Sequence, residues 1–179
     1  MLTADQTVFV FIDVQGRLAE LMHEKEALFA NLTRLIHGMR LFGVPLVWVE
    51  QTPEKLGQTS RVLRELLAPA EPIRKRSFSC WGEPAFVARL QELGRRQALL
   101  AGIETHICIH QTAADLRQQG YEVEVVADAV SSRTAGNRQI GLDRIRECGA
   151  RLTSVEMAFF ELMRQADHPA FLDILKLVR

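Results

Sequence analysis

The sequence predicts an α/β fold: a doubly wound, mainly parallel six-stranded sheet with helices on both faces. Short runs of β-branched and other apolar residues alternate with segments whose apolar residues recur at helical spacing. The first run, TVFVFI at Thr7–Ile12, is continuous, as expected of a strand buried on both faces of a parallel sheet. Strands separated by helices form right-handed βαβ units, which place helices on both sides of one sheet.

The first half of the chain contains three of the expected strands. After Thr7–Ile12, residues 24–42 carry apolar side chains on one helical stripe, and Gly43 ends that helix. Pro45–Val49 (PLVWV) is a second buried strand. The segments that follow are a short amphipathic helix, a short strand and a helix with proline in its first turn: Thr59–Leu67, Pro72–Lys75 and Pro84–Leu93.

The second half repeats this alternation. Its expected strands are Gln97–Ala101, Glu122–Ala127 and Ala150–Thr153. Glycine follows each of the two helices between them. The expected helices are Thr105–Gln119, Asn137–Cys148, 155–165 and Pro169–Val178. With 179 residues, no linker and no internal repeat, we expect residues 1–179 to form one domain.

The composition restricts the classes of partner. Lys and Arg number 22 and Asp and Glu number 22, so the formal net charge is zero. A balanced chain has no bulk electrostatic attraction to nucleic acid or to an anionic membrane, and we expect neither as a partner. No apolar run approaches the ~20 residues of a membrane span. The N-terminus lacks the basic region of a signal peptide, and the three cysteines fit no disulfide or zinc spacing, which predicts a reduced, cytoplasmic chain.

Ligands of open α/β sheets bind beyond the carboxyl ends of the strands, so the residues that follow each strand are the candidates for chemistry. Asp13 directly follows the first strand, although such an aspartate is often only a helix cap or a turn former. Lys75 ends the short strand at 72–75 and is either solvated or partly buried by Phe78 and Trp81.

Cys108 is the most informative of the three cysteines. It lies in the expected first turn of the helix after Gln97–Ala101, with Thr105 as a plausible N-cap. A thiol there is near the positive end of the helix dipole, which lowers its pKa from about 8.5 toward neutral. The alternative is a small buried apolar residue, the commonest role of a free cysteine. Neither Cys80 nor Cys148 has a helix N-terminus to activate it.

His106 and His110 have the i, i+4 spacing of a zinc pair, but no third ligand follows the second strand, where the chain reads VEQTPEK. We therefore expect no metal and no cofactor. Without a metal, the groups beside Cys108 that can act as acid, base or fixed charge are Asp13 and Lys75. Together, carboxylate, ammonium and thiol can form a nucleophilic site.

Four segments of the chain resemble the isochorismatase-like hydrolases, also called the cysteine hydrolase superfamily. They occur in family order: FIDVQG at Phe11–Gly16, KRSFS at Lys75–Ser79, AGIETHICI at Ala101–Ile109 and GYEVEVVADAVSSR at Gly120–Arg133. The compact length and the VEQ-x-P pattern are most similar to the small isochorismatase domain-containing branch.

The resemblance implies a catalytic triad of Asp13, Lys75 and Cys108. It also implies a cis peptide bond between Ile103 and Glu104, and an oxyanion hole formed by the N–H groups of Glu104 and Cys108. Metal-dependent nicotinamidases of the family have an Asp-x-His pair where this chain has Glu50, Gln51 and Thr52.

Three function classes follow from these residues. The first is a metal-independent hydrolase that cleaves a small amide, ureido or related C–N substrate through a Cys108 thioester. The second is an isochorismatase-type vinyl-ether hydrolase with Asp13 as proton donor, and the third is an inactive scaffold of the same fold. Gln51, Phe78 and Trp81 are the expected pocket walls, a small molecule is the expected partner, and the family implies a homo-oligomer (a dimer or tetramer).

Overall fold

The computed structural model describes residues 1–179 and contains a six-stranded sheet in which all neighbouring strands are parallel. The strand order is β3-β2-β1-β4-β5-β6, and the predicted doubly wound α/β architecture is confirmed. The strands are β1 (Thr7–Ile12), β2 (Leu46–Gln51), β3 (Ile73–Lys75), β4 (Gln97–Ile103), β5 (Glu122–Ser131) and β6 (Arg151–Thr153).

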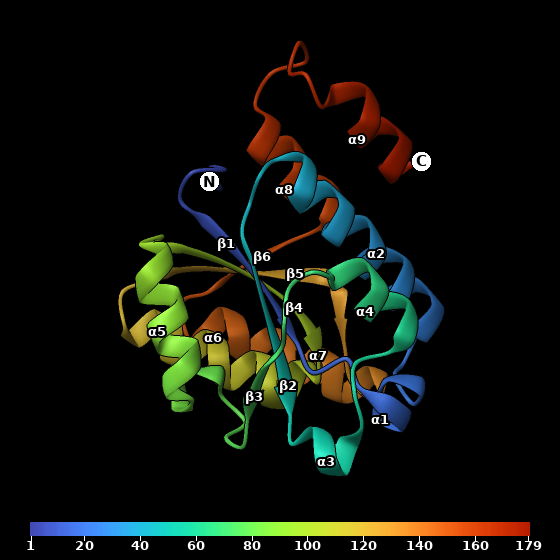
Figure 1. The fold of residues 1–179 in the computed structure, drawn as a ribbon, viewed down its shortest axis with the longest axis vertical. Helices are drawn as coiled ribbons and strands as arrows, with labels where there is room; N and C mark the ends of the chain where they lie inside the picture. The colour runs from blue at the N-terminus through green and yellow to red at the C-terminus, as the bar shows by residue number, and fades with distance from the viewer.

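Helices cover both faces of the sheet (Figure 1). On one face lie α1 (Gly16–Glu20), α2 (Lys25–Leu41), α4 (Arg61–Leu67) and α8 (Val155–Met163), and α9 (Phe171–Val178) packs against α2 and α8. The other packs against α5 (Pro84–Leu93), α6 (His110–Gln118) and α7 (Ala135–Glu147). Three short segments complete the chain: α3 (Pro53–Leu56), the 3-10 turn η1 (Cys80–Gly82) and the π-helical turn η2 (Thr105–Ile109). No helix has the length and apolarity needed to cross a bilayer.

Strand β1 explains why the chain needs both helical layers. All six of its residues are buried. Phe9 and Phe11 point into the core under α2 and α8, whereas Val8, Val10 and Ile12 point into the core under α5 and α6. Alternate side chains of a strand face opposite sides of a sheet, so a continuously apolar strand requires cover on both.

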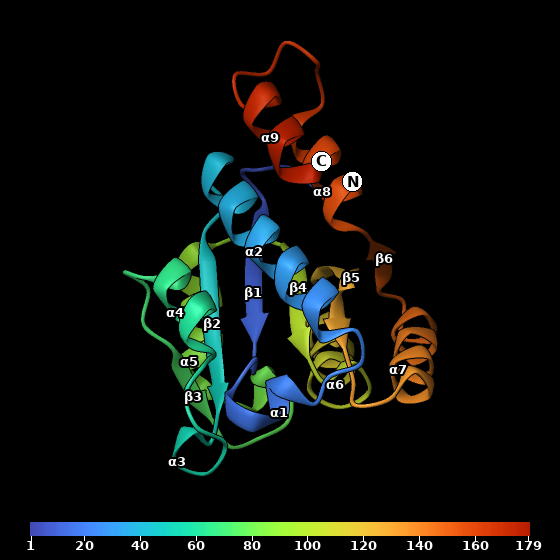
Figure 2. The same ribbon diagram turned by 90° about the vertical axis from the view of Figure 1, so that its right-hand side faces the viewer.

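The strand order reverses between β1 and β4, which is the point where open α/β sheets bind ligands. In Figure 2 the β1 arrow points toward α1 and α3, while both termini and α8–α9 lie at the opposite end of the molecule. Asp13, Gln51, Lys75 and the η2 turn therefore share one edge of the sheet.

Several expected boundaries near this edge are wrong. Strands β2 and β4 continue past Val49 and Ala101, to Gln51 and Ile103. Strand β5 continues past Ala127 to Ser131, because Ser131 pairs with Ile103 beyond a register shift in β4. The polar Asp128 interrupts the apolar run and hides this continuation. The single helix expected over 105–119 is instead the η2 turn followed by α6.

Gly102 makes the close passage of β4 against β1 possible. Its φ is +126°, a region that side chains other than glycine rarely adopt, and a Cβ at this position would lie 2.0 Å from the carbonyl oxygen of Ile12. Gly102 therefore allows the backbone contact immediately before Asp13.

Gly102→Ala should lower the free energy of unfolding by about 3 kcal/mol or more, at the upper end of the range for single substitutions. Urea denaturation measures this loss. Gly120→Ala is the matched control, since Gly120 also has positive φ, at +81°, but a Cβ there would meet nothing within 4 Å. Equal losses in the two variants would show that the contact with Ile12 is unimportant.

Candidate functional site

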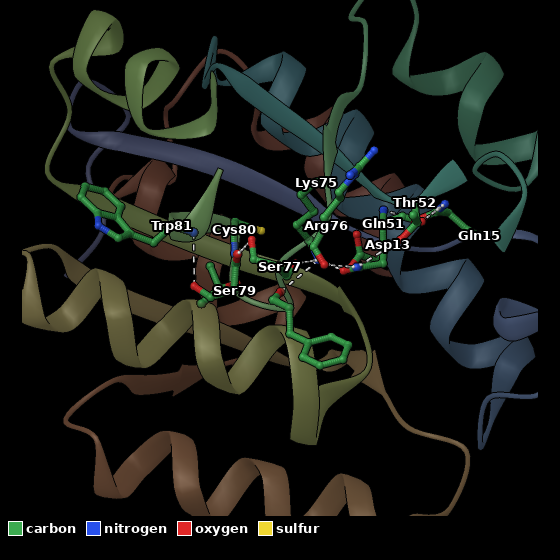
Figure 3. A network of polar contacts seen from close by, with 12 residues as sticks. Asp13, Gln15, Gln51, Thr52, Lys75, Arg76, Ser77, Ser79, Cys80 and Trp81 are labelled. Carbon is green, nitrogen blue, oxygen red and sulfur yellow. Dashed lines mark hydrogen bonds and ion pairs between the residues drawn. The ribbon is translucent and has the colours of Figure 1, made fainter. Parts of the chain in front are cut away.

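Three strand ends bring a carboxylate, an ammonium and a thiol to the same edge of the sheet. Asp13 follows β1, Lys75 is the last residue of β3, and Cys108 lies in η2 after β4. Asp13 Oδ2 lies 2.7 Å from Lys75 Nζ, and both side chains are almost completely buried. Figure 3 shows this pair beside Gln51, with Arg76 and Ser77 continuing the chain from Lys75.

The backbone of Asp13 aims its carboxylate at this edge. Its φ of +57° lies in the left-handed region, which aspartate tolerates better than most residues. Its N–H donates to the carbonyl of Val49 at 3.1 Å, and its carbonyl accepts from Gln15 N–H at 2.8 Å. Apart from the ion pair, neither carboxylate oxygen has a hydrogen-bond partner, so Oδ1 is free to accept a hydrogen bond from a thiol.

Lys75 is held by several oxygen atoms at once. Its Nζ donates to the side-chain oxygen of Gln51 and to the carbonyls of Ser77 (3.2 Å) and Phe78 (3.0 Å), besides its contact with Asp13. Burial lowers the pKa of Lys75, but the carboxylate of Asp13 and the neighbouring Cys108 and Cys80 together outweigh this effect, and the pKa is raised overall. Lys75 is therefore a fixed cation.

Gln51 reaches the site, but its side chain is already engaged by the protein. Its Oε1 accepts from Lys75, and its Nε2 donates to the carbonyl of Arg76 at 2.7 Å. The Gln51 backbone N–H in turn donates to Gln15 Oε1 at 2.6 Å. These contacts make Gln51 and Gln15 supports for the Asp13–Lys75 pair. Sequence reasoning assigned no role to Gln15, although its place in DVQG, two residues after a strand-end aspartate, is a signal that could have identified it.

Cys108 occupies the predicted place after β4, but its surroundings differ from the expectation. Glu104, and not Thr105, occupies the N-cap position, and the buried hydroxyl of Thr105 has no hydrogen-bond partner. Burial raises the pKa of the Cys108 thiol above its ordinary value, the Asp13 carboxylate raises it further, and Lys75 lowers it. The expected low pKa is therefore wrong, and the resting residue is a thiol next to a base.

The backbone before Cys108 provides a free hydrogen-bond donor. The peptide bond between Ile103 and Glu104 is cis. The Glu104 N–H donates to no acceptor, whereas the Glu104 carbonyl accepts from the N–H groups of Ile107 (3.1 Å) and Ile109 (3.2 Å). The Glu104 side chain does not accept this N–H; its Oε1 accepts from Arg133 instead.

The aromatic residues expected to line the pocket are separated by the structure. Phe78 is exposed (55%), and its backbone carbonyl contacts Lys75. Trp81 lies beyond Cys80, well away from Asp13 (Figure 3), and packs edge-on against Tyr121 at 6.2 Å between ring centroids. Trp81 lines a cavity together with residues of α5 and Tyr121, and it is not among the residues that border the cavity at Lys75, so its expected role as a wall of this pocket finds no support here.

The other two cysteines have different environments. Cys80 is fully buried, its N–H donates to Thr112 Oγ1 at 3.0 Å, and burial raises its pKa to about 12. Cys148 is half-buried, and its thiol donates to the carbonyl of Ile145 at 3.1 Å.

The two histidines after β4 do not share a ligand site. His106 Nδ1 lies 2.9 Å from Ser132 Oγ, and burial and Arg144 lower the pKa of His110. Neither belongs to a group of three or more His, Cys, Asp or Glu side chains that could hold a metal ion.

A polar cavity of about 500 Å³ borders Lys75 and lies between the β2–α3 and β3–η1 segments. A larger, mainly apolar cavity of about 680 Å³ lies against β2, β3 and α5 and contains none of the three reactive groups. Size therefore does not identify the site here; the buried ion pair and the thiol do.

The chain is similar to known proteins of one family. The Isochorismatase domain model matches residues 7–157. The secreted isochorismatase effector Isc1 of Phytophthora sojae (strain P6497) is 36% identical, over 97% of this chain and 84% of that protein. Isochorismatase domain-containing protein 1 of Salmo salar is 34% identical over 97% of this chain, which spans only 61% of that protein's length. The solved structure of MAR1 ribonuclease from Caenorhabditis elegans superposes with a TM-score of 0.92 at 32% identity, covering 99% of this chain and 91% of that one.

Proposed function

Because the chain belongs to the isochorismatase family of hydrolases, we propose that it is a metal-independent cysteine hydrolase. Its substrate would be a small amide, ureido or related C–N compound, cleaved through a covalent thioester on Cys108. The observation that carries the proposal is the buried Asp13–Lys75 ion pair, 2.7 Å long, next to that thiol.

Asp13 is the base in this mechanism. Its carboxylate takes the proton of the Cys108 thiol while the sulfur forms a bond to the substrate carbonyl carbon. Asp13 then returns the proton to the leaving nitrogen as the C–N bond breaks. In the second half, Asp13 takes a proton from water, the resulting hydroxyl attacks the thioester, and the proton goes back to the sulfur.

Lys75 and the backbone stabilise the negative charges that arise. The ammonium of Lys75 stays beside Asp13 and reduces the cost of a thiolate in a buried site. The free N–H of Glu104 and the N–H of Cys108 would receive the oxyanion of the tetrahedral intermediate, since such donors act most strongly where water is excluded.

The donor set around the site supports metal independence. The chain has Glu50, Gln51 and Thr52 after β2, where metal-dependent members of the family have Asp-x-His. Glu50 Oε1 accepts from Thr59 N–H at 2.7 Å, and Gln51 is engaged by Lys75. These side chains are committed to structural bonds.

The remaining expectations are part of the proposal. We keep a small molecule as partner, with Phe78 as a candidate contact, and a homo-oligomeric assembly. The cytoplasm stays the proposed location, although one relative is named a secreted effector. A solved relative is named a ribonuclease, but the zero net charge of this chain gives no support to an RNA substrate.

The test is to trap the thioester. The protein is incubated with a panel of small amides, ureas and carbamoyl compounds, acid-quenched, and its intact mass and peptides are measured. We expect an acyl adduct on Cys108, and none in Cys108→Ala. Cys148→Ala is the control and should acylate normally. An adduct only on Cys80 or Cys148 would contradict the mechanism, and turnover that survives in Cys108→Ala would favour vinyl-ether hydrolysis.

A further inference from the structure

Glu104 is an unexpected residue to find buried beside a nucleophile. Its side chain is only 6% exposed, and a buried carboxylate costs stability unless it is paired and hydrogen-bonded. Arg133 provides both the opposite charge and the hydrogen bonds. Oε1 of Glu104 accepts from the backbone N–H of Arg133 at 3.2 Å and from its Nε at 3.1 Å.

A second contact links the η2 turn to the segment that follows β5. His106 Nδ1 lies 2.9 Å from the hydroxyl of Ser132, which is fully buried. The side chains of Glu104 and His106, at and next to the start of the turn that carries Cys108, thus contact the consecutive residues Arg133 and Ser132 after β5. This segment is itself anchored, because Ser132 O accepts from His23 N–H at 2.9 Å and Ser131 Oγ donates to His23 O at 2.6 Å.

Helix α7 packs closely against the η2 turn. A Cβ on Gly141 would lie 2.7 Å from His106 N and 2.8 Å from the carbonyl carbon of Thr105. The backbone of the turn therefore has little freedom to move toward α7.

We infer that Glu104 and Arg133, assisted by the His106–Ser132 contact, form a clamp that orients the oxyanion-hole N–H of Glu104. The inference rests on the proposed function. Glu104 is held at its carbonyl by the N–H groups of Ile107 and Ile109, and at its side-chain Oε1 by Arg133, so the direction of its free N–H is defined. Glu104 and Arg133 are positioning residues: the carboxylate acts through its own backbone and does not touch the substrate.

The chain contains a matched control for this ion pair. Glu124 is also a buried carboxylate, with a side chain 5% exposed, and it pairs with Arg151 at 2.8 Å. The exposures of the two arginines are nearly equal, 53% for Arg133 and 54% for Arg151. Only Glu104–Arg133 adjoins the η2 turn, so loss of each pair should have similar structural but different chemical consequences.

The experiment compares two reactions of Cys108. Acylation by p-nitrophenyl acetate forms an S–C bond and expels p-nitrophenolate through a tetrahedral oxyanion, with the thiol proton going to Asp13. Alkylation by iodoacetamide displaces iodide from a saturated carbon and forms no oxyanion. A defect in the oxyanion hole therefore slows the first reaction and leaves the second unchanged.

Glu104→Ala should slow acylation of Cys108 by about tenfold or more. The upper limit is the ~10²–10³-fold loss of rate that follows complete removal of an oxyanion-hole donor. Alkylation should stay within about twofold of wild type. Glu104→Gln should recover most of the rate, because its amide oxygen can still accept from both N–H groups of Arg133. Glu124→Ala should leave both rates unchanged. Arg133→Met, at a position whose side chain is 53% exposed, is an independent variant and should also slow acylation selectively.

The outcomes separate the two proposals. If wild type is not acylated on Cys108, the proposed function fails and the clamp fails with it. If wild type is acylated but Glu104→Ala and Arg133→Met react at the wild-type rate, the clamp is refuted and the proposed function stands. If acylation and alkylation fall together, the pair affects the thiol or the fold, which also refutes the clamp.

Discussion

Asp13→Asn is expected to lower kcat/KM by about 10²–10⁴-fold, the usual contribution of a positioned general base. Asparagine keeps the shape of the side chain but cannot accept the thiol proton. Without that base, the buried thiol of Cys108 stays protonated, because burial raises its pKa above its ordinary value. Steady-state kinetics on the substrate identified by the acylation panel measures the loss. A variant with near-wild-type kcat/KM would rule out Asp13 as the base.

The pH dependence of kcat/KM is a second test of Asp13 as the base. Burial raises the pKa of Asp13, and the ammonium of Lys75 only partly opposes this shift. Asp13 must be ionised to act as a base, so wild-type kcat/KM should fall as the pH drops through a value above that of an ordinary aspartate, ~3.9. In Asp13→Asn this limb should disappear, and the residual rate should rise at alkaline pH as the Cys108 thiol itself ionises.

Lys75→Met should reduce the free energy of unfolding by about 3–5 kcal/mol, the cost of breaking a buried ion pair from one side. Methionine fills much of the space of the lysine stem, so the loss comes mainly from the unpaired Asp13 carboxylate and from the acceptors on Gln51, Ser77 and Phe78. Urea denaturation at neutral pH measures the change.

The double variant Asp13→Asn/Lys75→Met is the control for this prediction. It removes both charges and should recover a large part of the stability lost in Lys75→Met, giving a measurable coupling energy between the two sites. The loss in Lys75→Met should also depend on pH. An aspartate whose pKa is raised by folding contributes stability below its unfolded pKa and loses it as the pH rises through the folded value. The deficit should therefore be smaller near pH ~4 than at neutral pH; a deficit that is independent of pH would contradict this origin.

Much of the fold could be predicted because its signals are local. A strand buried on both faces needs an uninterrupted apolar run, and a helix beside it needs apolar residues at a spacing of three and four. These patterns located all six strands, and the ends of those strands identified Asp13, Lys75 and Cys108. The largest boundary errors, at β5 and at 105–119, depend on pairing with β4 and on the irregular η2 turn, neither of which has a local signal.

Which residues surround the site could be learned only from the tertiary structure. Trp81 and Phe78 are close to Lys75 in sequence, yet one packs on Tyr121 and the other is exposed. The supporting roles of Gln15 and Glu104 arise from partners that are distant in sequence, at Gln51 and Arg133.

By itself, the sequence determined the class of fold, the order of its elements and the three groups that can react, because periodicity and strand ends are properties of neighbouring residues. Only the tertiary structure decided how those groups ionise. The sequence predicted a low pKa for Cys108 from its place in a first helical turn, whereas burial and the carboxylate of Asp13 raise it. The physical reason is that a pKa depends on desolvation and on charges within a few ångströms, and folding sets both through contacts between distant parts of the chain.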